Sequence, residues 1–343
     1  MTKATIKDVA KLAEVSLKTV SRVINKEPSV SRTKVLIVED AIKKLGYKPN
    51  LAARNLRSTK SYAVALVYDN PNPYYVIDMQ NGALNACRDK GYGLQIHPCY
   101  SDDSSIAQDL VQLVKTADLA GLLLAPPISE RADIISILRD NDVHYVGIVS
   151  GSKENDELSP CICVDDRQAA YEITDHLIKE GHTDIAFFWG EEIHKSSPER
   201  FSGYQDALKD HHIELKEEFI FEGEYSFESG MKNAEKLIAL KQKPSALFCS
   251  NDEIAAGALT AFNAAGLTVP HDIAIAGFED SPFSRHSSPP ITTAKQATQS
   301  IAEAATNSLI HEIRPDARSK GEEKPKTIYS PSLIIRPSTT GKD

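Results

Sequence analysis

Residues 5–25 read TIKDVAKLAEVSLKTVSRVIN, a pattern that predicts two short helices joined by a tight turn. Thr5 and Asp8 have the spacing of a capping box, and Ser16 can cap the second helix. The connection is too short for a side-by-side hairpin, so we expect the helices to cross steeply, as in a helix-turn-helix. The predicted inward-facing residues are Ile6, Val9, Ala10, Ala13, Val20, Val23 and Ile24.

A third helix is predicted to begin at Ser31 and to stop at Gly46. It would close a small core over the first two helices, so residues 1–46 are expected to form a small all-α domain. The pattern alone also fits an ordinary three-helix domain with a solvated basic face. The apolar positions of the third helix are Val35, Val38, Ile42 and Leu45.

Charge is distributed unevenly along the chain. Residues 1–60 contain 14 Lys and Arg against 5 Asp and Glu, whereas the remainder contains 25 against 43, and the net charge of −9 hides this contrast. A basic head on an acidic protein is typical of a molecule that touches nucleic acid at one end. On the outer side of the second helix, Arg22 could pair with guanine, Lys18 with guanine or phosphate, and Leu17 with a thymine methyl group.

Residues 5–25, together with LGYKPNLAAR at residues 45–54, resemble the amino-terminal signature of the LacI/GalR family of bacterial transcription regulators. One departure is Glu14, which stands where the family usually has Gly or another small residue in the turn. The resemblance implies that the head binds double-stranded operator DNA.

The segment after Pro49 is the second predicted DNA-reading device. Residues 51–57 could form only about two helical turns, too few to be stable alone in water. In the family this hinge helix folds when two subunits meet on DNA and wedges a leucine into the minor groove, and Leu56 occupies the matching position. A solvated linker is the alternative. The predicted DNA-binding residues are Thr5, Ser16, Leu17, Lys18, Thr19, Ser21, Arg22, Asn25, Asn50, Ala53 and Leu56.

From residue 62 onward, apolar runs of strand length alternate with segments of helix length. Such runs are typical of parallel strands in a sheet covered on both faces. The body is too long for one such sheet and the pattern restarts after residue 160, which predicts an α/β body of two doubly wound lobes around a cleft. The predicted strands lie at residues 64–67, 94–96, 121–124, 145–148, 185–188, 219–221, 246–248 and 273–276.

The body also resembles the core of the same family, which is similar in fold to periplasmic sugar-binding proteins. In the family the chain crosses between the lobes three times, so each lobe is expected to be discontinuous. The resemblance implies a helix-turn-helix at residues 1–46, a hinge at 47–61, a first lobe at 62–163 and 293–325, and a second lobe at 164–292 and 326–343.

The resemblance also implies the ligand contacts in the cleft. Arg200 matches an arginine that clamps ligand hydroxyls or a carboxylate, and Tyr225 takes the place of an aromatic that stacks on the ligand. Two departures are Glu279, where Asp is usual, and Val149, where some relatives carry Asp. The predicted effector-binding residues are Tyr74, Tyr75, Ser196, Arg200, Tyr225, Asn251, Asp252, Glu279 and Gln296.

These observations predict a homodimeric transcriptional repressor of carbohydrate-utilisation genes. It would bind a near-palindromic operator and be controlled by a small sugar or sugar derivative, with no other cofactor. The sequence does not indicate whether the ligand strengthens or weakens DNA binding. The alternatives are a purine- or nucleoside-responsive regulator of the same type, a sugar-binding receptor without DNA function, and a carbohydrate-active enzyme. The tail after residue 336 has no apolar heptads, which favours a dimer over a tetramer.

The remaining motifs favour a non-enzymatic cytoplasmic protein. We find no signal peptide, no run long enough to cross a bilayer, and no nucleophile elbow, phosphate loop or zinc-protease motif. The five cysteines are therefore expected to be reduced. Cys161 and Cys163 should face the same side of a strand, and they are interpreted as small core residues rather than as a metal or redox pair.

Overall fold

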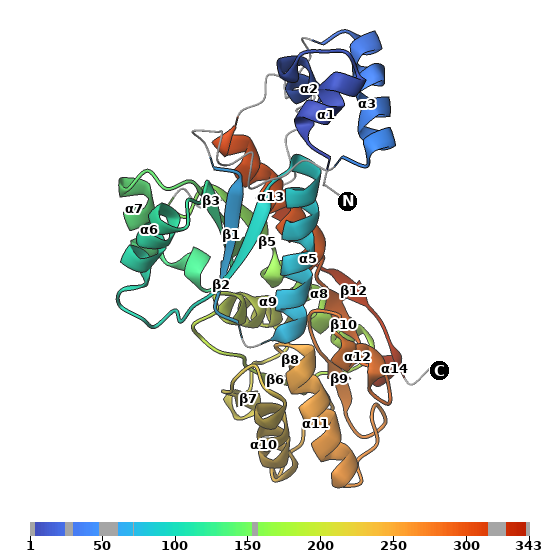
Figure 1. Cartoon of the computed structure of the whole chain (residues 1–343). Helices are drawn as coiled ribbons and strands as arrows, with labels where there is room; N and C mark the ends of the chain where they lie inside the picture. The colour runs from blue at the N-terminus through green and yellow to red at the C-terminus, as the bar shows by residue number, and fades with distance from the viewer. Residues whose placement is uncertain are drawn as a thin grey trace. The chain divides into compact units, whose positions relative to one another are not determined.

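In the computed structural model, residues 4–24, 30–47, 61–70, 72–152, 157–314 and 327–340 are described. The chain divides between Ser61 and Tyr62 into two units, a helical head and an α/β body (Figure 1). None of the helices among these residues is long and apolar enough to cross a bilayer.

The head consists of α1 (Ile6–Leu12), α2 (Leu17–Ile24) and α3 (Arg32–Leu45). The Asp8 carboxylate accepts hydrogen bonds from the backbone N–H of Thr5 at 2.8 Å and from its hydroxyl at 2.7 Å. Those two bonds hold the pKa of Asp8 below its usual value. The backbone N–H of Thr19 donates to Ser16 Oγ at 3.2 Å, and Gly46 ends α3 with φ of 57°. Both helix starts and the helix stop agree with the predictions from sequence.

The core of the head is built from the expected apolar stripes. Val9, Ala10 and Ala13 of the first helix pack against Val20 and Val23 of the second, and Val38 and Ala41 of α3 close over them. Partly buried residues complete this core: Ile6, Val15, Ile24, Val30, Val35, Ile42, Leu45 and Tyr47.

Glu14 adopts the left-handed conformation, with φ of 50°, directly after α1. The next backbone N–H, that of Val15, then donates to the Ala10 carbonyl at 3.1 Å and closes the helix end. A residue with a Cβ atom pays roughly 1–2 kcal/mol for this conformation, whereas glycine does not. Glycine at this turn would therefore relieve backbone strain.

Replacing Glu14 with glycine is expected to stabilise the head by about 1 kcal/mol, because it removes that strain. Native-state hydrogen exchange of the α1 and α3 amides would measure the change. Glu39→Gly is the matched control. Glu39 is exposed within α3, and glycine there should destabilise the head by roughly 0.5–1 kcal/mol. Equal destabilisation by both variants would contradict the interpretation that the left-handed backbone of Glu14 is strained.

The first lobe contains a parallel sheet with strand order β11-β5-β4-β3-β1-β2. One face is covered by α5 (Pro73–Lys90) and α13 (Thr298–Ile313), which run side by side in Figure 1. The other face is covered by α6 (Ile106–Thr116) and α7 (Ala132–Asp140), and the short turn η1 (Ile128–Glu130) precedes α7. The strands are β1 (Ala63–Tyr68), β2 (Gly93–Pro98), β3 (Gly121–Leu124), β4 (Tyr145–Ser150), β5 (Cys161–Val164) and β11 (Ile328–Tyr329).

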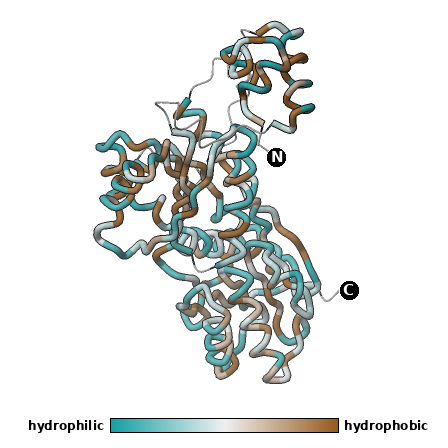
Figure 2. The backbone as a smooth tube through the Cα atoms, viewed as in Figure 1, coloured by the Kyte–Doolittle hydropathy of each residue, from teal (hydrophilic) through white to brown (hydrophobic). Residues whose placement is uncertain are grey.

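The second lobe repeats this plan with strand order β7-β6-β8-β9, and the strands of both lobes are mainly hydrophobic (Figure 2). Two helices pack on each face: α8 (Asp166–Lys179) with α9 (Ser196–Asp210), and α10 (Phe227–Ile238) with α11 (Asp252–Ala264). The strands are β6 (Ile185–Phe188), β7 (Ile220–Phe221), β8 (Ala246–Cys249) and β9 (Ala274–Ala276). Smaller elements are η2 (Glu217–Phe219), α12 (Pro282–His286), the antiparallel pair β10 (Thr293–Lys295) and β12 (Ser332–Ile334), and α14 (Pro337–Thr340).

Every predicted strand run contains a strand, and Cys161 and Cys163 face the same core of the first lobe. The chain passes between the lobes after Val164, after Lys295 and after Tyr329. The lobe boundaries predicted at residues 293 and 326 differ from the crossings observed after Lys295 and Tyr329. Because β10 pairs with β12, residues 293–295 stay in the second lobe, and because β11 pairs with β5, residues 328–329 belong to the first. Strands this short leave no periodic signal in the sequence.

Candidate functional site

The surface of α2 carries most of the predicted DNA-binding residues that the structure describes. Leu17 is 45% exposed at the start of this helix, an unusual position for an apolar side chain in water. Lys18 and Arg22 stand one helical turn apart and therefore share a face. Thr19 and Ser21 are half-buried beside them, and Thr5 is the cap residue of α1. Asn25, Asn50, Ala53 and Leu56 lie outside the described residues.

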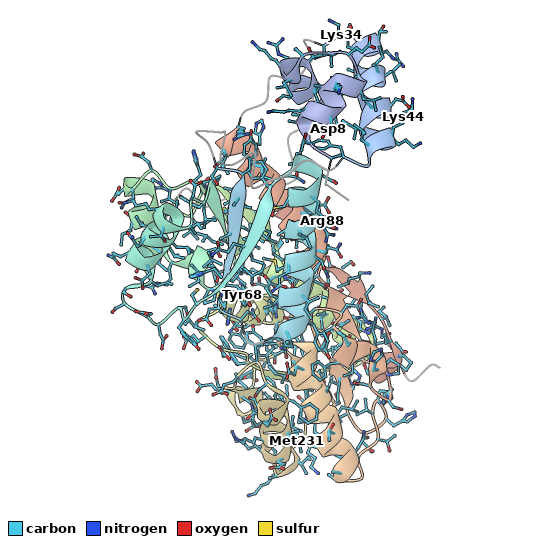
Figure 3. All side chains as sticks on the ribbon, in the orientation of Figure 1. Asp8, Lys34, Lys44, Tyr68, Arg88 and Met231 are labelled. Atoms are coloured by element: carbon cyan, nitrogen blue, oxygen red, sulfur yellow. The ribbon has the colours of Figure 1, made fainter. Side chains whose placement is uncertain are left out.

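Further exposed cations lie on α3 of the head. Lys34 and Lys44 project from α3 into solvent (Figure 3). Lys44 forms an ion pair of 2.7 Å with Asp40, but both side chains are more than half exposed, so the pair contributes little to stability.

A cavity lies between the two lobes, beyond the carboxyl ends of both sets of strands. Its free space is about 50 Å³, well below the several hundred Å³ of a typical ligand pocket, so a ligand requires the lobes or side chains to move. The lining residues are, from the first lobe, Asn70, Asn72, Tyr75, Pro126, Glu130, Ile148, Val149, Ser150 and Val164, and from the second lobe and the crossing segment, Asp166, His194, Ser196, Arg200, Tyr225, Asn251, Glu279 and Gln296.

Arg200 on α9 is buried at the floor of this cavity. Its Nε and Nη2 atoms lie 2.9 and 2.8 Å from Asp166 Oδ1, and Nη1 donates to the Ser250 carbonyl at 2.6 Å. The guanidinium carbon also sits 3.8 Å from the centre of the Phe278 ring. Burial opposes the charge of Arg200, but the charges of Asp166, Tyr225 and Glu279, together with the hydrogen bond to Asp166, outweigh burial and raise the pKa of Arg200 above its usual value. Asp166 is the carboxylate in direct contact with this cation, and Glu279 also interacts with it electrostatically.

Two more carboxylates face the cavity, and each accepts a hydrogen bond from the opposite lobe. Glu130 Oε2 accepts from the backbone N–H of Lys195 at 3.1 Å, and Asn72 Nδ2 donates to Glu279 Oε2 at 2.8 Å. Burial raises the pKa of Glu130 to about 7 and that of Glu279 to about 8. Among the described residues neither forms an ion pair.

Aromatic and imidazole rings form one wall. The Tyr225 hydroxyl lies 2.8 Å from Ser197 Oγ, and its ring meets the His194 ring edge-on at 5.6 Å. Burial lowers the pKa of His194 to about 4, so this ring is neutral at physiological pH. Gly190 lies so close to Tyr225 that a Cβ atom there would sit 2.3 Å from the ring. Glycine is therefore needed for the ring to occupy this place.

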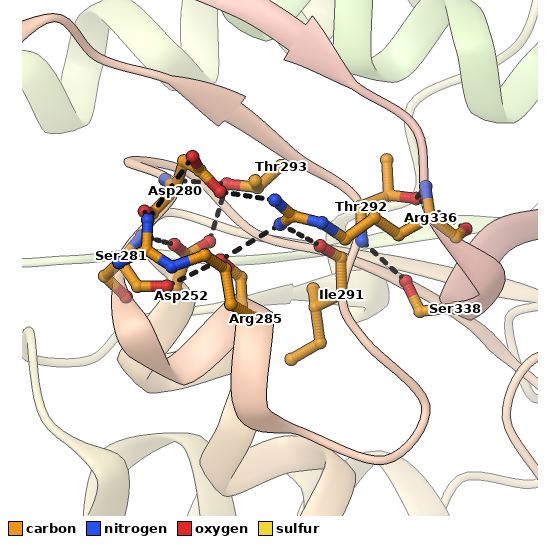
Figure 4. Close-up of polar contacts among 10 residues, drawn as sticks. Asp252, Asp280, Ser281, Arg285, Ile291, Thr292, Thr293, Arg336 and Ser338 are labelled. Atoms are coloured by element: carbon orange, nitrogen blue, oxygen red, sulfur yellow. Dashed lines mark hydrogen bonds and ion pairs between the residues drawn. The ribbon is translucent and has the colours of Figure 1, made fainter.

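The backbone at Glu279 and Asp280 is strained, and a polar network holds Asp280 in place (Figure 4). Glu279 and Asp280 have φ of 108° and 58°, in the region that favours glycine. Arg336, from the carboxyl-terminal segment, donates to Asp280 Oδ1 at 2.5 Å and to the Ile291 carbonyl at 3.0 Å. The Glu279 N–H donates to the Ala294 carbonyl at 2.8 Å. This network fixes where the Glu279 carboxylate enters the cavity.

Two predicted cleft residues, Tyr74 and Asp252, do not line the cavity. Tyr74 is 41% exposed and packs edge-on against Phe283 in an outer groove. Asp252 is fully buried and accepts hydrogen bonds from the Ser281 N–H and the Thr293 hydroxyl, both at 2.6 Å. Burial raises the pKa of Asp252 to about 6. The other predicted cleft residues do line it: Tyr75, Ser196, Arg200, Tyr225, Asn251, Glu279 and Gln296.

The sequence analysis did not predict that Glu130, Asp166 and His194 line the cavity. Asp166 follows β5 at the carboxyl end of the strand, where polar residues of parallel sheets meet a ligand, so its position was a usable signal. Glu130 lies in η1, beyond the loop after β3, and only the fold brings it to the cleft. No cluster of His, Cys, Asp and Glu within the described ranges could hold a metal ion.

Comparisons with known proteins agree with both units. A model described as bacterial regulatory proteins, lacI family, matches residues 5–50, and one described as periplasmic binding protein-like domain matches residues 174–339. The HTH-type transcriptional repressor PurR of Actinobacillus pleuropneumoniae serotype 3 (strain JL03) is 32% identical over 336 residues, 98% of each chain. The probable HTH-type transcriptional repressor ExuR of Bacillus subtilis (strain 168) is 32% identical over 344 residues, 97% of this chain and 98% of the relative.

Solved structures with the same fold span the whole chain. The transcriptional regulator CelR in complex with cellobiose has a TM-score of 0.71 at 26% identity, with coverage of 98% of this chain and 99% of the other. The lac repressor dimer bound to operator and the anti-inducer ONPF has a TM-score of 0.74 at 24% identity, with 99% of each chain covered, which establishes likeness of fold alone.

Proposed function

The chain belongs to the lacI family of bacterial regulatory proteins, and we infer that its cleft binds a small sugar or sugar derivative that controls how tightly the helix-turn-helix holds operator DNA. The observation that carries this proposal is the polar, aromatic-walled cavity at the carboxyl ends of both sheets. Its carboxylates accept hydroxyl donors, and the Tyr225 ring offers a face for a sugar ring. CelR, a regulator of the same fold, is known in complex with cellobiose.

Arg200 can donate hydrogen bonds to such a ligand while it keeps its contacts with Asp166 and Ser250. A guanidinium has five N–H donors, and Asp166 and Ser250 occupy three of them. The other two remain for ligand oxygens at the cavity. Hydrogen bonds across the cleft, such as Asn72 to Glu279, would be exchanged for bonds to the ligand, which changes the relative position of the lobes.

We propose that the protein acts as a homodimer in the cytoplasm, as a repressor of carbohydrate-utilisation genes and without a catalytic cofactor. A two-fold dimer presents two identical heads, so its operator is a near-palindrome. Ligand and DNA are then coupled by roughly 1–3 kcal/mol. The bound ligand leaves chemically unchanged, in contrast to the substrate of a carbohydrate-active enzyme.

Selection from random duplexes, followed by anisotropy titrations with the selected operator, tests the proposal. Mono- and disaccharides, amino sugars, sugar acids and purines are then screened by thermal shift with and without operator, because a ligand of the native form raises the melting temperature. We expect a salt-sensitive palindrome and a sugar that changes operator affinity. Selection of no palindrome, or control by a purine alone, would contradict the proposal.

Replacing Arg22 with alanine is expected to weaken operator binding by roughly 1–3 kcal/mol and to relax sequence preference, because a bidentate base contact is lost. Lys34→Ala, on the exposed face of α3, should instead weaken binding to all duplexes alike, as a phosphate contact does. Anisotropy with operator and scrambled duplexes separates the two effects. Equal loss on both duplexes for Arg22→Ala would exclude its role in base readout.

A further inference from the structure

We propose that Arg336 is a positioning residue of the effector site: from outside the cleft, it holds the strained turn that presents the Glu279 carboxylate to the ligand. This inference rests on the proposed function, because it concerns the affinity of the same cleft. It goes beyond that function by assigning a role in ligand binding to the carboxyl-terminal segment, none of whose described residues lines the cavity.

The turn at Glu279 and Asp280 has a backbone that is costly for residues other than glycine. Their φ angles are 108° and 58°, and such conformations persist only where the surrounding structure holds them. Without those contacts the turn would relax towards negative φ. The relaxation would rotate the peptide between the two residues and draw the Glu279 carboxylate away from Asn72, whose Nδ2 now donates to it at 2.8 Å. The contacts of Asp280 therefore control the place of this carboxylate.

Arg336 connects Asp280 to the neighbouring backbone. Its Nη2 donates to Asp280 Oδ1 at 2.5 Å, and its Nη1 donates to the Ile291 carbonyl at 3.0 Å and to Ser284 Oγ at 3.2 Å. The two charged side chains are only 17% and 8% exposed, so water replaces these bonds poorly. Arg285 also donates to the Asp280 carbonyl, at 2.7 Å, but its side chain is 48% exposed. Arg336 is therefore the buried anchor of the turn.

The backbone around Arg336 is fixed as well (Figure 4). The Arg336 N–H donates to Thr292 Oγ1 at 2.9 Å. Two residues further on, Ser338 Oγ accepts from the Thr292 N–H at 2.8 Å and donates to the Ile275 carbonyl of β9 at 2.6 Å. The preceding strand β12 pairs with β10. The guanidinium is thus carried by a segment that is bonded to the second lobe on both sides of it.

A purely structural role for Arg336 predicts a different behaviour. If the ion pair with Asp280 only stabilised the second lobe, its loss would lower the urea midpoint and leave the affinity of the folded cleft unchanged. If the pair positions Glu279, its loss also weakens ligand binding, and a turn that needs no anchor recovers the binding. Asp280→Gly supplies such a turn, because glycine adopts a φ of 58° without steric cost and the unpaired carboxylate is removed.

The test compares the full-length protein with Arg336→Ala and with Arg336→Ala/Asp280→Gly. Calorimetry measures the dissociation constants of glucose, galactose, glucosamine, glucuronate, galacturonate and cellobiose. For every sugar that binds the unaltered protein, we expect Arg336→Ala to bind at least tenfold more weakly. The double variant should bind at least threefold more tightly than Arg336→Ala.

Hydrogen exchange provides a second measurement that needs no sugar. The Glu279 N–H donates to the Ala294 carbonyl at 2.8 Å, so its protection factor reports whether the turn keeps its place. We expect Arg336→Ala to lower this protection factor at least tenfold. The double variant should recover at least threefold of the loss.

Lys216→Ala is the matched control. Lys216 forms an ion pair of 2.6 Å with Asp184 in the same lobe, and the two side chains are 31% and 30% exposed. Asp184 directly precedes β6, so this pair lies at the amino end of the strand, opposite the end that faces the cleft. The variant should keep both the sugar affinity and the protection of the Glu279 amide.

The urea midpoint and operator affinity show whether each variant is folded. If Arg336→Ala does not fold, Arg336→Lys takes its place. Lysine keeps the positive charge, but its single ammonium group lacks the spread of donors that joins Asp280 to the Ile291 carbonyl, so at least a threefold loss of sugar affinity is expected.

A smaller loss of sugar affinity than expected, or a double variant that binds no more tightly than Arg336→Ala, overturns this inference and leaves the sugar effector intact. If none of the six sugars binds the unaltered protein, the proposed sugar effector fails instead. The Glu279 amide then decides this inference alone, and protection in Arg336→Ala equal to that in Lys216→Ala overturns it.

Discussion

Replacing Arg200 with alanine is expected to lower the free energy of unfolding of the body by about 3–5 kcal/mol, because it leaves the Asp166 carboxylate buried without its partner. Both side chains are almost fully buried, at 3% and 2% exposure, so water cannot replace the lost ion pair. The Ser250 carbonyl also loses its donor. Urea unfolding followed by circular dichroism measures the loss, and operator binding by the head should persist below the unfolding range.

An exposed ion pair in the same lobe is the matched control. Arg167 lies 2.6 Å from Asp206, but these side chains are 50% and 41% exposed, so Arg167→Ala should cost under about 1 kcal/mol. The double variant Arg200→Ala/Asp166→Ala should lose about 0.5–3 kcal/mol less than the sum of its single changes. Equal costs for Arg200→Ala and Arg167→Ala would show that the buried pair does not carry the stability assigned to it.

Replacing Gly190 with alanine is expected to weaken the sugar response at least tenfold, a loss of about 1.4 kcal/mol, while ligand-free operator binding stays unchanged. The new Cβ would sit 2.3 Å from the Tyr225 ring, so the ring must leave its place. That movement breaks the bonds of its hydroxyl to Ser196 and Ser197 and fills the small cavity. Anisotropy titrations of operator complexes with the sugar measure the response.

Gly93→Ala is the control for this change. A Cβ atom at Gly93 would meet its nearest neighbour at 3.8 Å, an ordinary contact, so the sugar response should be that of the unaltered protein. If Gly190→Ala responded at the same sugar concentration as Gly93→Ala, the Tyr225 ring would not be part of the ligand site.

The helices of the head and the main strands were predictable because their apolar periodicity is strong and their caps carry specific side chains. Thr5 and Ser16 take part in hydrogen bonds at the starts of two helices, and Gly46 provides the left-handed backbone that ends the third. The site was predictable in part, since the carboxyl ends of parallel strands gather polar residues. Arg200 and Glu279 lie there as expected.

The remainder depends on tertiary structure. Glu130 reaches the cleft through a loop whose path no local pattern specifies, and Asp252 turns inward because Ser281 and Thr293 offer it donors. Tyr74 and Tyr75 are neighbours on one helix, yet only Tyr75 faces the cavity. Neighbouring residues on a helix point in different directions, and sequence resemblance alone does not reveal which of the two faces the cavity.

The late return of α13 to the first lobe has a consequence for synthesis on the ribosome. Gly82 of α5 lets this helix approach so closely that a Cβ atom would lie 2.0 Å from the Gln299 carbonyl oxygen, and Ile301 and Leu309 complete the same core. A nascent chain therefore exposes the apolar face of α5 until α13 has emerged. Prematurely terminated products keep that face uncovered, which makes them substrates for chaperones and proteases.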